Sequence, residues 1–199
     1  MADLTKASHV YFFVFVLGAL SVGAAYLFSL AVPSPPFWLE TVTPLIAYGL
    51  LFYVWDRLLW KVRAFAVLGL SVPDLNGRWV GTLRSSYIEN GQNKEIPIIL
   101  EIRQRFSKVS VDSYTATSDA TSHSSTATVQ EIGEDFVLIF HYENVPNTMK
   151  AGTMQQHQGT ARLKLIEGER VLHGRYFNDL GNYGDISVQF KSATLKHRY

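Results

Sequence analysis

The stretch that decides the fold is VYFFVFVLGALSVGAAYLFSLAV, residues Val10–Val32. No Asp, Glu, Lys or Arg occurs from Val10 through Leu39. About 20 apolar residues in a helix cover the roughly 30 Å of a bilayer core. A secretory signal peptide has a shorter apolar region, and a helix of a soluble core has a polar face. The stretch therefore predicts a membrane-spanning helix.

A second apolar run, TPLIAYGLLFYVW, covers Thr43–Trp55 after the short turn PSPPFWLE. We expect this helix to have Thr43 as its N-cap and Pro44 at its first position, where a missing N–H costs little. The two runs together predict a transmembrane hairpin. With the semi-apolar connector that follows, expected to continue the helix, it forms a first domain of residues 1–72.

The charges that flank the two runs indicate the topology. Lys6 precedes the first run, whereas Arg57, Lys61 and Arg63 follow the second. The turn between them carries Glu40 and no cation. The positive-inside rule then predicts a multi-pass membrane protein with both termini in the cytoplasm and the turn outside.

Small residues recur at every fourth position of the first run, at Ser21, Ala25 and Ser29. Such spacing lets two helix backbones approach closely in lipid. It is compatible with self-association of several hairpins and equally with packing of the first helix against the second.

From residue 73 onward, apolar and polar residues alternate, which is typical of strands with one buried face. Turn residues such as Asn90-Gly91 separate most of the segments. The pattern predicts an all-β, eight-stranded antiparallel meander barrel for residues 73–199, with a sandwich as the alternative. The expected strands are Asp74–Leu83, Glu95–Phe106, Lys108–Thr117, Ser122–Gln130, Phe136–Asn144, His157–Glu167, Arg170–Asn178 and Asp185–Ser192.

The interior of an eight-stranded barrel is either filled or large enough for one small ligand. Alternation places the aromatic residues Trp79, Tyr142 and Tyr176 on the inner face, where their rings can stack on a planar ligand. Asn178 and Ser85 offer hydrogen bonds on the same face. These five residues are the candidate ligand-binding residues, although Trp79 is also expected simply to fill the barrel.

Two stretches depart from a plain core pattern. Ser113–Thr128 is dominated by Ser and Thr, which is compatible with a cavity lining and, more simply, with a solvated hairpin. Asn144–Gln156 is the longest connection, and it predicts either a lid or a surface excursion.

Several functions lack support in the sequence. The chain has no Cys, which excludes disulfides and thiol chemistry. Its six His residues show no ligand spacing, and no nucleophile elbow or phosphate-cradling loop occurs. Its 18 Lys+Arg nearly balance 17 Asp+Glu, whereas a protein that binds a DNA or RNA polymer normally carries a basic surplus. We therefore expect no enzyme, no metal site and no cofactor.

The whole arrangement resembles a known family. Two N-terminal helices, a short connector and the strand Asn76-Gly77-Arg78-Trp79-x-Gly81 that opens a small barrel are similar to the two-transmembrane β-barrel effectors of CBASS, the bacterial cyclic-oligonucleotide-based antiphage signalling system. The Gly-x-Trp element is also similar to the first strand of lipocalin-like barrels.

The CBASS resemblance implies a membrane-embedded antiphage effector. Its cytoplasmic barrel would bind a cyclic dinucleotide as the activating ligand, and binding would trigger oligomerisation and disruption of the lipid bilayer, leading to abortive infection. Two alternatives stay open: a membrane-tethered lipocalin-like binder of a lipid or other apolar ligand, without killing activity, and a structural membrane subunit.

Overall fold

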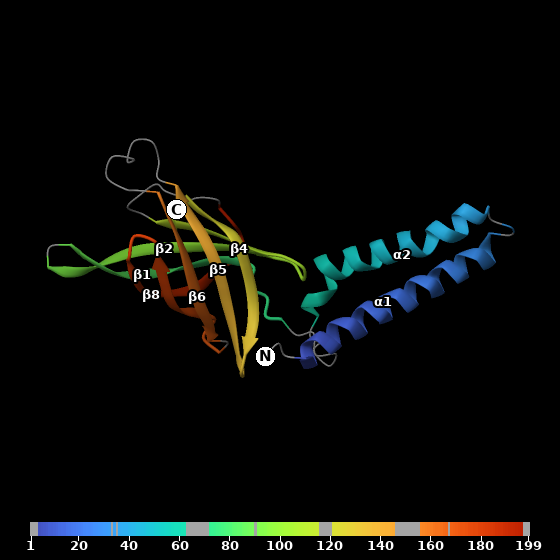
Figure 1. Cartoon of the computed structure of the whole chain (residues 1–199), viewed down its shortest axis with the longest axis horizontal. Coiled ribbons are helices and arrows are strands. Elements are labelled where there is room, and N and C mark those ends of the chain that lie inside the picture. The colour runs from blue at the N-terminus through green and yellow to red at the C-terminus, as the bar shows by residue number, and fades with distance from the viewer. Residues whose placement is uncertain are drawn as a thin grey trace. The chain divides into compact units, whose positions relative to one another are not determined.

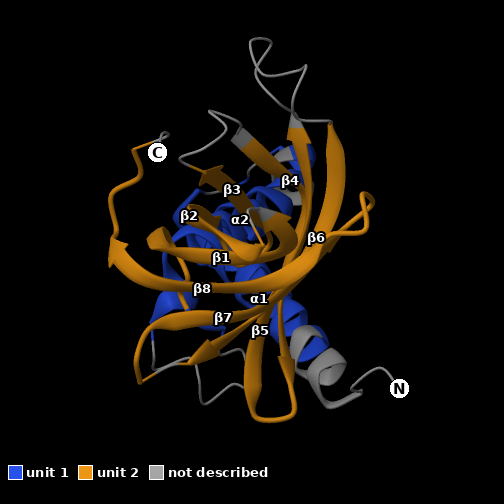
Figure 2. Ribbon diagram, turned by 90° about the vertical axis from the view of Figure 1, so that its left-hand side faces the viewer, with its two compact units in different colours: residues 1–73 blue, residues 74–199 orange. Residues whose placement is uncertain are grey.

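The computed structural model describes residues 4–32, 34, 36–62, 72–89, 91–115, 121–145, 156–166 and 168–196 (Figure 1). The chain divides into two compact units, Met1–Pro73 and Asp74–Tyr199 (Figure 2). The first unit contains the helices α1, Leu4–Ala31, and α2, Phe37–Arg57, and the short 3-10 helix η1, Leu59–Lys61. The second unit contains all the strands.

One helix in the described part of the chain is long and apolar enough to cross a membrane, over Tyr11–Ala31. The predicted second helix is present as α2, but a second membrane span is not confirmed. Its predicted start was wrong: α2 begins at Phe37 after Pro36, so Pro44 lies inside the helix and not at its first position. The reason is that helix-compatible residues continue upstream of Pro44 as far as Pro36, whose φ of −58° suits an N-cap.

The two helices pack against each other through one face of α1. Phe13, Leu17 and Ser21 are buried at intervals of four residues, which places them on one side of the helix. The ring of Phe13 lies 4.4 Å from that of Trp55 in α2. The Ser21 hydroxyl donates a hydrogen bond to the Gly18 carbonyl within the helix. Ser21, the first residue of the small-residue row, therefore packs within this pair of helices.

The second unit is a closed antiparallel barrel in which each strand pairs with the next and β8 pairs with β1. The predicted eight-stranded meander is thus confirmed, and closure of the sheet rules out the sandwich. The strands are β1 (Gly77–Glu89), β2 (Gln92–Gln104), β3 (Val109–Thr115), β4 (Thr121–Ile132), β5 (Asp135–Val145), β6 (His157–Ile166), β7 (Val171–Asn178) and β8 (Tyr183–Ser192).

Neighbouring strands run in opposite directions, so successive turns lie at opposite ends of the barrel. One end, the entry end, carries the start of β1 and the end of β8. The opposite end carries the β1–β2 and β7–β8 turns. In the described residues the connector is helical as far as the end of η1 at Lys61. Its predicted continuation over residues 63–71 lies outside the described part of the chain.

The predicted inner face is largely confirmed. The buried core contains Trp79, Ile98, Leu100, Ile102, Val111, Leu138, Phe140, Leu163, Leu172, Tyr176, Ile186 and Val188, and Leu83, Val109, Tyr142, Leu165 and Phe190 pack against it. Register shifts occur in β1 between Arg84 and Ile88 and in β4 between Ser124 and Thr126. The shift in β1 lies near the end of the strand, and the shift in β4 lies outside the stretches whose side chains form the core. Simple alternation of inward and outward residues therefore predicts the core correctly.

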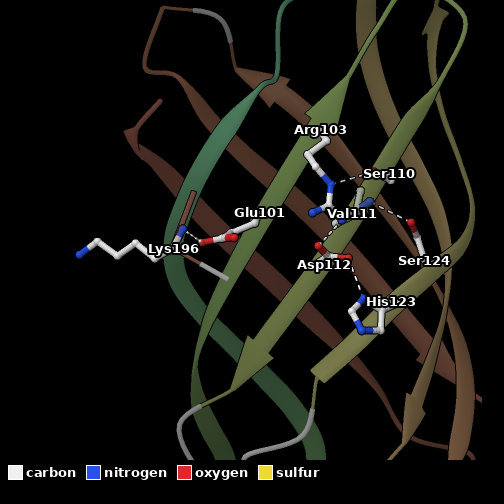
Figure 3. Close-up of polar contacts among 8 residues, drawn as sticks. All are labelled: Glu101, Arg103, Ser110, Val111, Asp112, His123, Ser124 and Lys196. Atoms are coloured by element: carbon white, nitrogen blue, oxygen red, sulfur yellow. Dashed lines mark hydrogen bonds and ion pairs between the residues drawn. The ribbon is translucent and has the colours of Figure 1, made fainter. Parts of the chain in front are cut away.

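Arg78 and Glu101 form a buried ion pair on the outer wall. Arg78 donates to Glu101 at 2.6 Å, and neither side chain is more than 8% exposed. The backbone N–H of Lys196, beyond the end of β8, donates to the same carboxylate at 2.8 Å (Figure 3). The segment after β8 therefore lies against the outside of β2, and it seals this pair from water.

Candidate ligand-binding site

The inward side chains change from apolar to polar along the barrel. On β5 the inner row runs from Leu138 and Phe140 to Tyr142 and Asn144, and β7 changes in the same direction. The polar ends of these rows lie at the end opposite the entry end. We call this polar end the mouth and define it by Ser85, Tyr142, Asn144, His157, Tyr176 and Asn178.

A hydrogen bond crosses one strand inside the mouth. The Tyr176 hydroxyl donates to Ser85 Oγ at 2.9 Å, and both side chains are buried. Tyr176 in β7 and Ser85 in β1 are both register partners of Gly184 in β8. A Cβ at Gly184 would lie 3.0 Å from the Tyr176 ring and would overlap the carbonyl oxygen of Arg84. The absence of a side chain at Gly184 therefore allows the tyrosine to reach across β8.

Tyr142 uses a second glycine in the same way. Tyr142 in β5 is the register partner of Gly159 in β6. A Cβ at Gly159 would overlap the Tyr142 hydroxyl and lie 2.7 Å from the carbonyl oxygen of Phe177. Cross-strand pairs of an aromatic ring with glycine let the ring lie flat over the neighbouring strand. Both mouth tyrosines are therefore held by strand register.

Asn144 and His157 complete one side of the mouth. They are register partners on β5 and β6, and Asn144 Nδ2 lies 3.4 Å from His157 Nε2. The His157 ring is edge-on to Tyr142, with 6.4 Å between the ring centroids. Sequence reasoning missed both residues as site candidates. Alternation from Tyr142 could have pointed to Asn144, because the inward row of β5 continues without a bulge.

The structure places the remaining predicted residues differently. Asn178 ends β7 in the mouth, and its Oδ1 accepts the backbone N–H of Asn182 across the β7–β8 turn at 2.9 Å. Trp79 lies near the entry end, where its Nε1 donates to the Leu75 carbonyl at 2.9 Å and its ring is edge-on to Phe190. The structure therefore brings four of the five predicted residues together in the mouth: Ser85, Tyr142, Tyr176 and Asn178. Trp79 instead fills the barrel interior near the entry end.

Burial sets the protonation state of the two mouth tyrosines. Desolvation raises the pKa of Tyr142 well above its ordinary value, with smaller contributions from Tyr176 and Asp179. Desolvation also raises the pKa of Tyr176, although its hydrogen bond with Ser85 partly opposes the shift. Both hydroxyls are therefore neutral at physiological pH and can donate hydrogen bonds. The mouth combines aromatic faces with neutral polar groups.

Two arginines on the outer wall are held in ion pairs. Arg84 pairs with Glu95, and Arg103 pairs with Asp112, in both cases at 2.5 Å on the outer wall. The residues predicted to form a lid, 146–155, lie outside the described part of the chain.

The Ser/Thr-rich hairpin contributes to both faces of the wall. Ser113 and Ser122 are register partners of the inward residues Leu100 and Asn144, so they face the interior, whereas Asp112 and His123 make polar contacts on the outer face (Figure 3). Asp112 in β3 accepts from Arg103 and lies 2.8 Å from His123 Nδ1 in β4. The backbone N–H of Val111 donates to Ser124 Oγ at 2.8 Å. These contacts fasten the short strand β3 to both neighbours. Across the described residues, no group of three or more His, Asp or Glu side chains is arranged to hold a metal ion.

Comparison with known proteins identifies the barrel. Residues 70–189 match the family model described as the Cap15 cyclic dinucleotide receptor domain. The chain belongs to this family. The match extends from before β1 into β8, so the barrel as a whole is the receptor domain, and the resemblance to CBASS effectors is confirmed.

Two curated relatives carry the name CD-NTase-associated protein 15. The protein from Staphylococcus schleiferi is 26% identical over 153 residues, which cover 76% of this chain and 80% of the relative. The protein from Escherichia albertii is 28% identical over 119 residues, which cover 59% of each chain.

Proposed function

We propose that the mouth holds a cyclic dinucleotide, and that its binding drives oligomerisation of the chain, disruption of the bacterial inner membrane and abortive infection. The observation that carries this proposal is the gathering of polar and aromatic inward residues at one end of the receptor barrel, while Trp79 and aliphatic side chains fill the other.

The chemistry of the mouth suits a nucleobase. Aromatic side chains stack on bases with about 1–3 kcal/mol per base, and Tyr142, Tyr176 and His157 supply such rings. Ser85 and Asn178 offer hydrogen bonds to base edges or ribose hydroxyls. The neutral state of the tyrosines avoids repulsion between a tyrosinate and the phosphates of the ligand.

The membrane part of the proposal rests on the helices. We place α1 and α2 in the inner membrane as a hairpin, with both chain termini in the cytoplasm. Ala25 and Ser29 border a hollow of about 340 Å³ beside Thr43 and Pro44 of α2. This hollow leaves room beside the small residues Ala25 and Ser29 for a helix of a second hairpin. The ligand shifts the association equilibrium only if it binds the assembled state more tightly.

Dye leakage from vesicles tests the proposal with the full chain. The protein is reconstituted into vesicles of phosphatidylethanolamine and phosphatidylglycerol, and a panel of cyclic dinucleotides is added. We expect at least one ligand to cause leakage. Replacing Ala25 and Ser29 with Leu should abolish leakage but preserve ligand binding.

Ala24→Leu is the matched control, because Ala24 is an exposed residue of α1 outside the small-residue row. Vesicles that contain the Ala24→Leu variant should release as much dye on addition of ligand as vesicles that contain the wild type. Absence of leakage with every ligand would contradict membrane disruption, and equal leakage from the Ala25→Leu/Ser29→Leu variant would contradict this association face.

A further inference from the structure

Charges on the outer wall of the barrel mostly face opposite charges across neighbouring strands. Arg84 is the register partner of Glu95, and Arg78 is the register partner of Glu101. Both pairs form ion pairs. Such opposite-charge cross-strand pairs stabilise a sheet modestly, whereas like charges placed directly opposite each other destabilise it.

The outer face of β6 and β7 breaks this pattern. Arg162 in β6 is the register partner of Arg175 in β7, and Lys164 is the register partner of His173. All four side chains are exposed. They form a two-by-two group of basic residues, which we call the basic block. Folding brings the like charges of Arg162 and Arg175 directly opposite each other, although sheet stability alone favours the opposite arrangement.

Nearby carboxylates balance only part of the basic block. Asp135 pairs with Lys164 at 2.8 Å, and Asp185 lies 3.8 Å from Arg175 Nε. Among the described residues, Arg162 has no ion pair and no side-chain hydrogen bond. One guanidinium is thus free to bind an anion, and a second is held only by a long contact.

The basic block also borders a hollow in the wall. An open groove of about 290 Å³ is lined by all four residues of the block together with Asp135, Val137 and the backbone of Gly174. Lys164 and His173 each lie two residues from the strand ends at the β6–β7 turn, on the side of the entry end. The groove is therefore outside the barrel and away from the mouth.

We propose that the basic block is a second anion site, separate from the mouth, and that it takes a phosphate group. Guanidinium groups bind phosphate through two parallel hydrogen bonds, and these charge-assisted bonds are stronger than neutral ones. A phosphate bound between Arg162 and Arg175 attracts both guanidinium groups and offsets the repulsion between them. The phosphate is carried either by the headgroup of an anionic lipid or by a free phosphate compound.

The first arm of the test uses inorganic phosphate with the full chain in neutral detergent. Thermal unfolding is followed at constant ionic strength while phosphate replaces chloride. A ligand that binds only the folded state raises the unfolding midpoint. We expect phosphate to raise the midpoint of the wild type, and we expect Arg162→Gln/Arg175→Gln to lose this rise. Arg84→Gln/Arg105→Gln, which removes two exposed arginines elsewhere on the wall, should retain it.

The second arm distinguishes the sources of the phosphate. Hydrogen exchange of the β6–β7 peptides is compared between nanodiscs of phosphatidylcholine and nanodiscs that also contain phosphatidylglycerol. Protection by phosphatidylglycerol that Arg162→Gln/Arg175→Gln abolishes assigns the site to lipid headgroups. A response to inorganic phosphate without that protection assigns it to a free compound.

The proposal is overturned if Arg162→Gln/Arg175→Gln matches the wild type with both probes, or if the control double variant loses the response equally. Folding of the Arg162→Gln/Arg175→Gln variant is checked by its circular dichroism spectrum. Arg162→Lys/Arg175→Lys provides a second readout, since it keeps both charges but removes the paired N–H donors and should weaken phosphate binding.

Discussion

Tyr176 and Ser85 lie 91 residues apart in the sequence, and their side chains form a 2.9 Å hydrogen bond across Gly184. The bond ties β7 to β1 over the intervening strand β8. It can form only because the middle strand has no side chain at this position. The same three residues therefore contribute to the stability of the barrel and to the shape of its mouth.

Gly184→Ala should damage both stability and ligand binding. The new Cβ overlaps the Arg84 carbonyl and crowds the Tyr176 ring, so β8 or the tyrosine must move. Overpacking of this kind costs about 1–3 kcal/mol. Thermal unfolding and calorimetric titration of the full chain would measure the two effects. Gly168→Ala is the control, because a Cβ there meets no atom within 4 Å; similar losses in both variants would contradict the role of Gly184.

The buried tyrosines predict a loss of stability at high pH. Tyr142 ionises near its ordinary pKa of 10.0 in the unfolded chain, but burial keeps it neutral to higher pH in the folded barrel. The contribution of neutral Tyr142 to the free energy of unfolding is fully present below pH 10. It is lost as the pH rises above that value towards the raised pKa of the folded state. Chemical unfolding between pH 9 and pH 11.5 should show a steeper decline for the wild type than for Tyr142→Phe. Equal slopes would show that Tyr142 is not desolvated.

Glu101→Gln should destabilise the barrel strongly. The substitution removes the charge that faces Arg78 in a fully buried pair, and breaking such a pair costs about 3 kcal/mol. It also weakens the acceptor of the Lys196 N–H, so that amide should exchange its hydrogen faster. Unfolding midpoints and hydrogen exchange check the two effects. Glu95→Gln, in an exposed pair with Arg84, should change the midpoint far less.

The sequence was sufficient to predict the strands and their inner faces. Alternation along β5 predicts that Leu138, Phe140 and Tyr142 face inward, and the structure places Leu138 and Phe140 in the core with Tyr142 packed against it. Alternation fixes the face of a strand but not the height of a residue along the barrel. That height depends on register and shear, which non-local pairing determines. For this reason alternation alone predicts that Trp79 shares a site with Tyr142 and Tyr176, although Trp79 lies near the other end of the barrel.

Pairing between strands also explains the site residues that were missed. His157 begins β6, and only its register with Asn144 places it beside Tyr142. The roles of Gly159 and Gly184 likewise appear only when their cross-strand partners are known. A glycine in a strand is otherwise compatible with a bulge or a weak strand.

The helical unit shows a different limit of sequence reasoning. The Thr43-Pro44 pair has the features of a helix start, but α2 begins at Phe37. Local capping preferences are small, and packing of an apolar face commonly outweighs them. The small-residue spacing at Ser21 is compatible with self-association of hairpins or with packing of the first helix against the second. The burial of Ser21 within the single chain favours helix packing at this position.

Calorimetric titration of the full chain with a panel of cyclic dinucleotides tests the central claim most directly. The Ser85→Ala/Tyr176→Phe variant removes both partners of the mouth hydrogen bond. The backbone N–H of the exposed residue Tyr87 also donates to Ser85 Oγ and loses this acceptor, so we expect a small loss of stability. Tyr114→Phe alters a buried tyrosine on the outer side of the wall and serves as the control. We predict that the wild type and the control bind at least one ligand equally, and that the double variant binds it about tenfold or more weakly, a loss of at least about 1.4 kcal/mol. Binding by the double variant that equals the wild type, or no binding to any member of the panel, would contradict the assignment of the mouth.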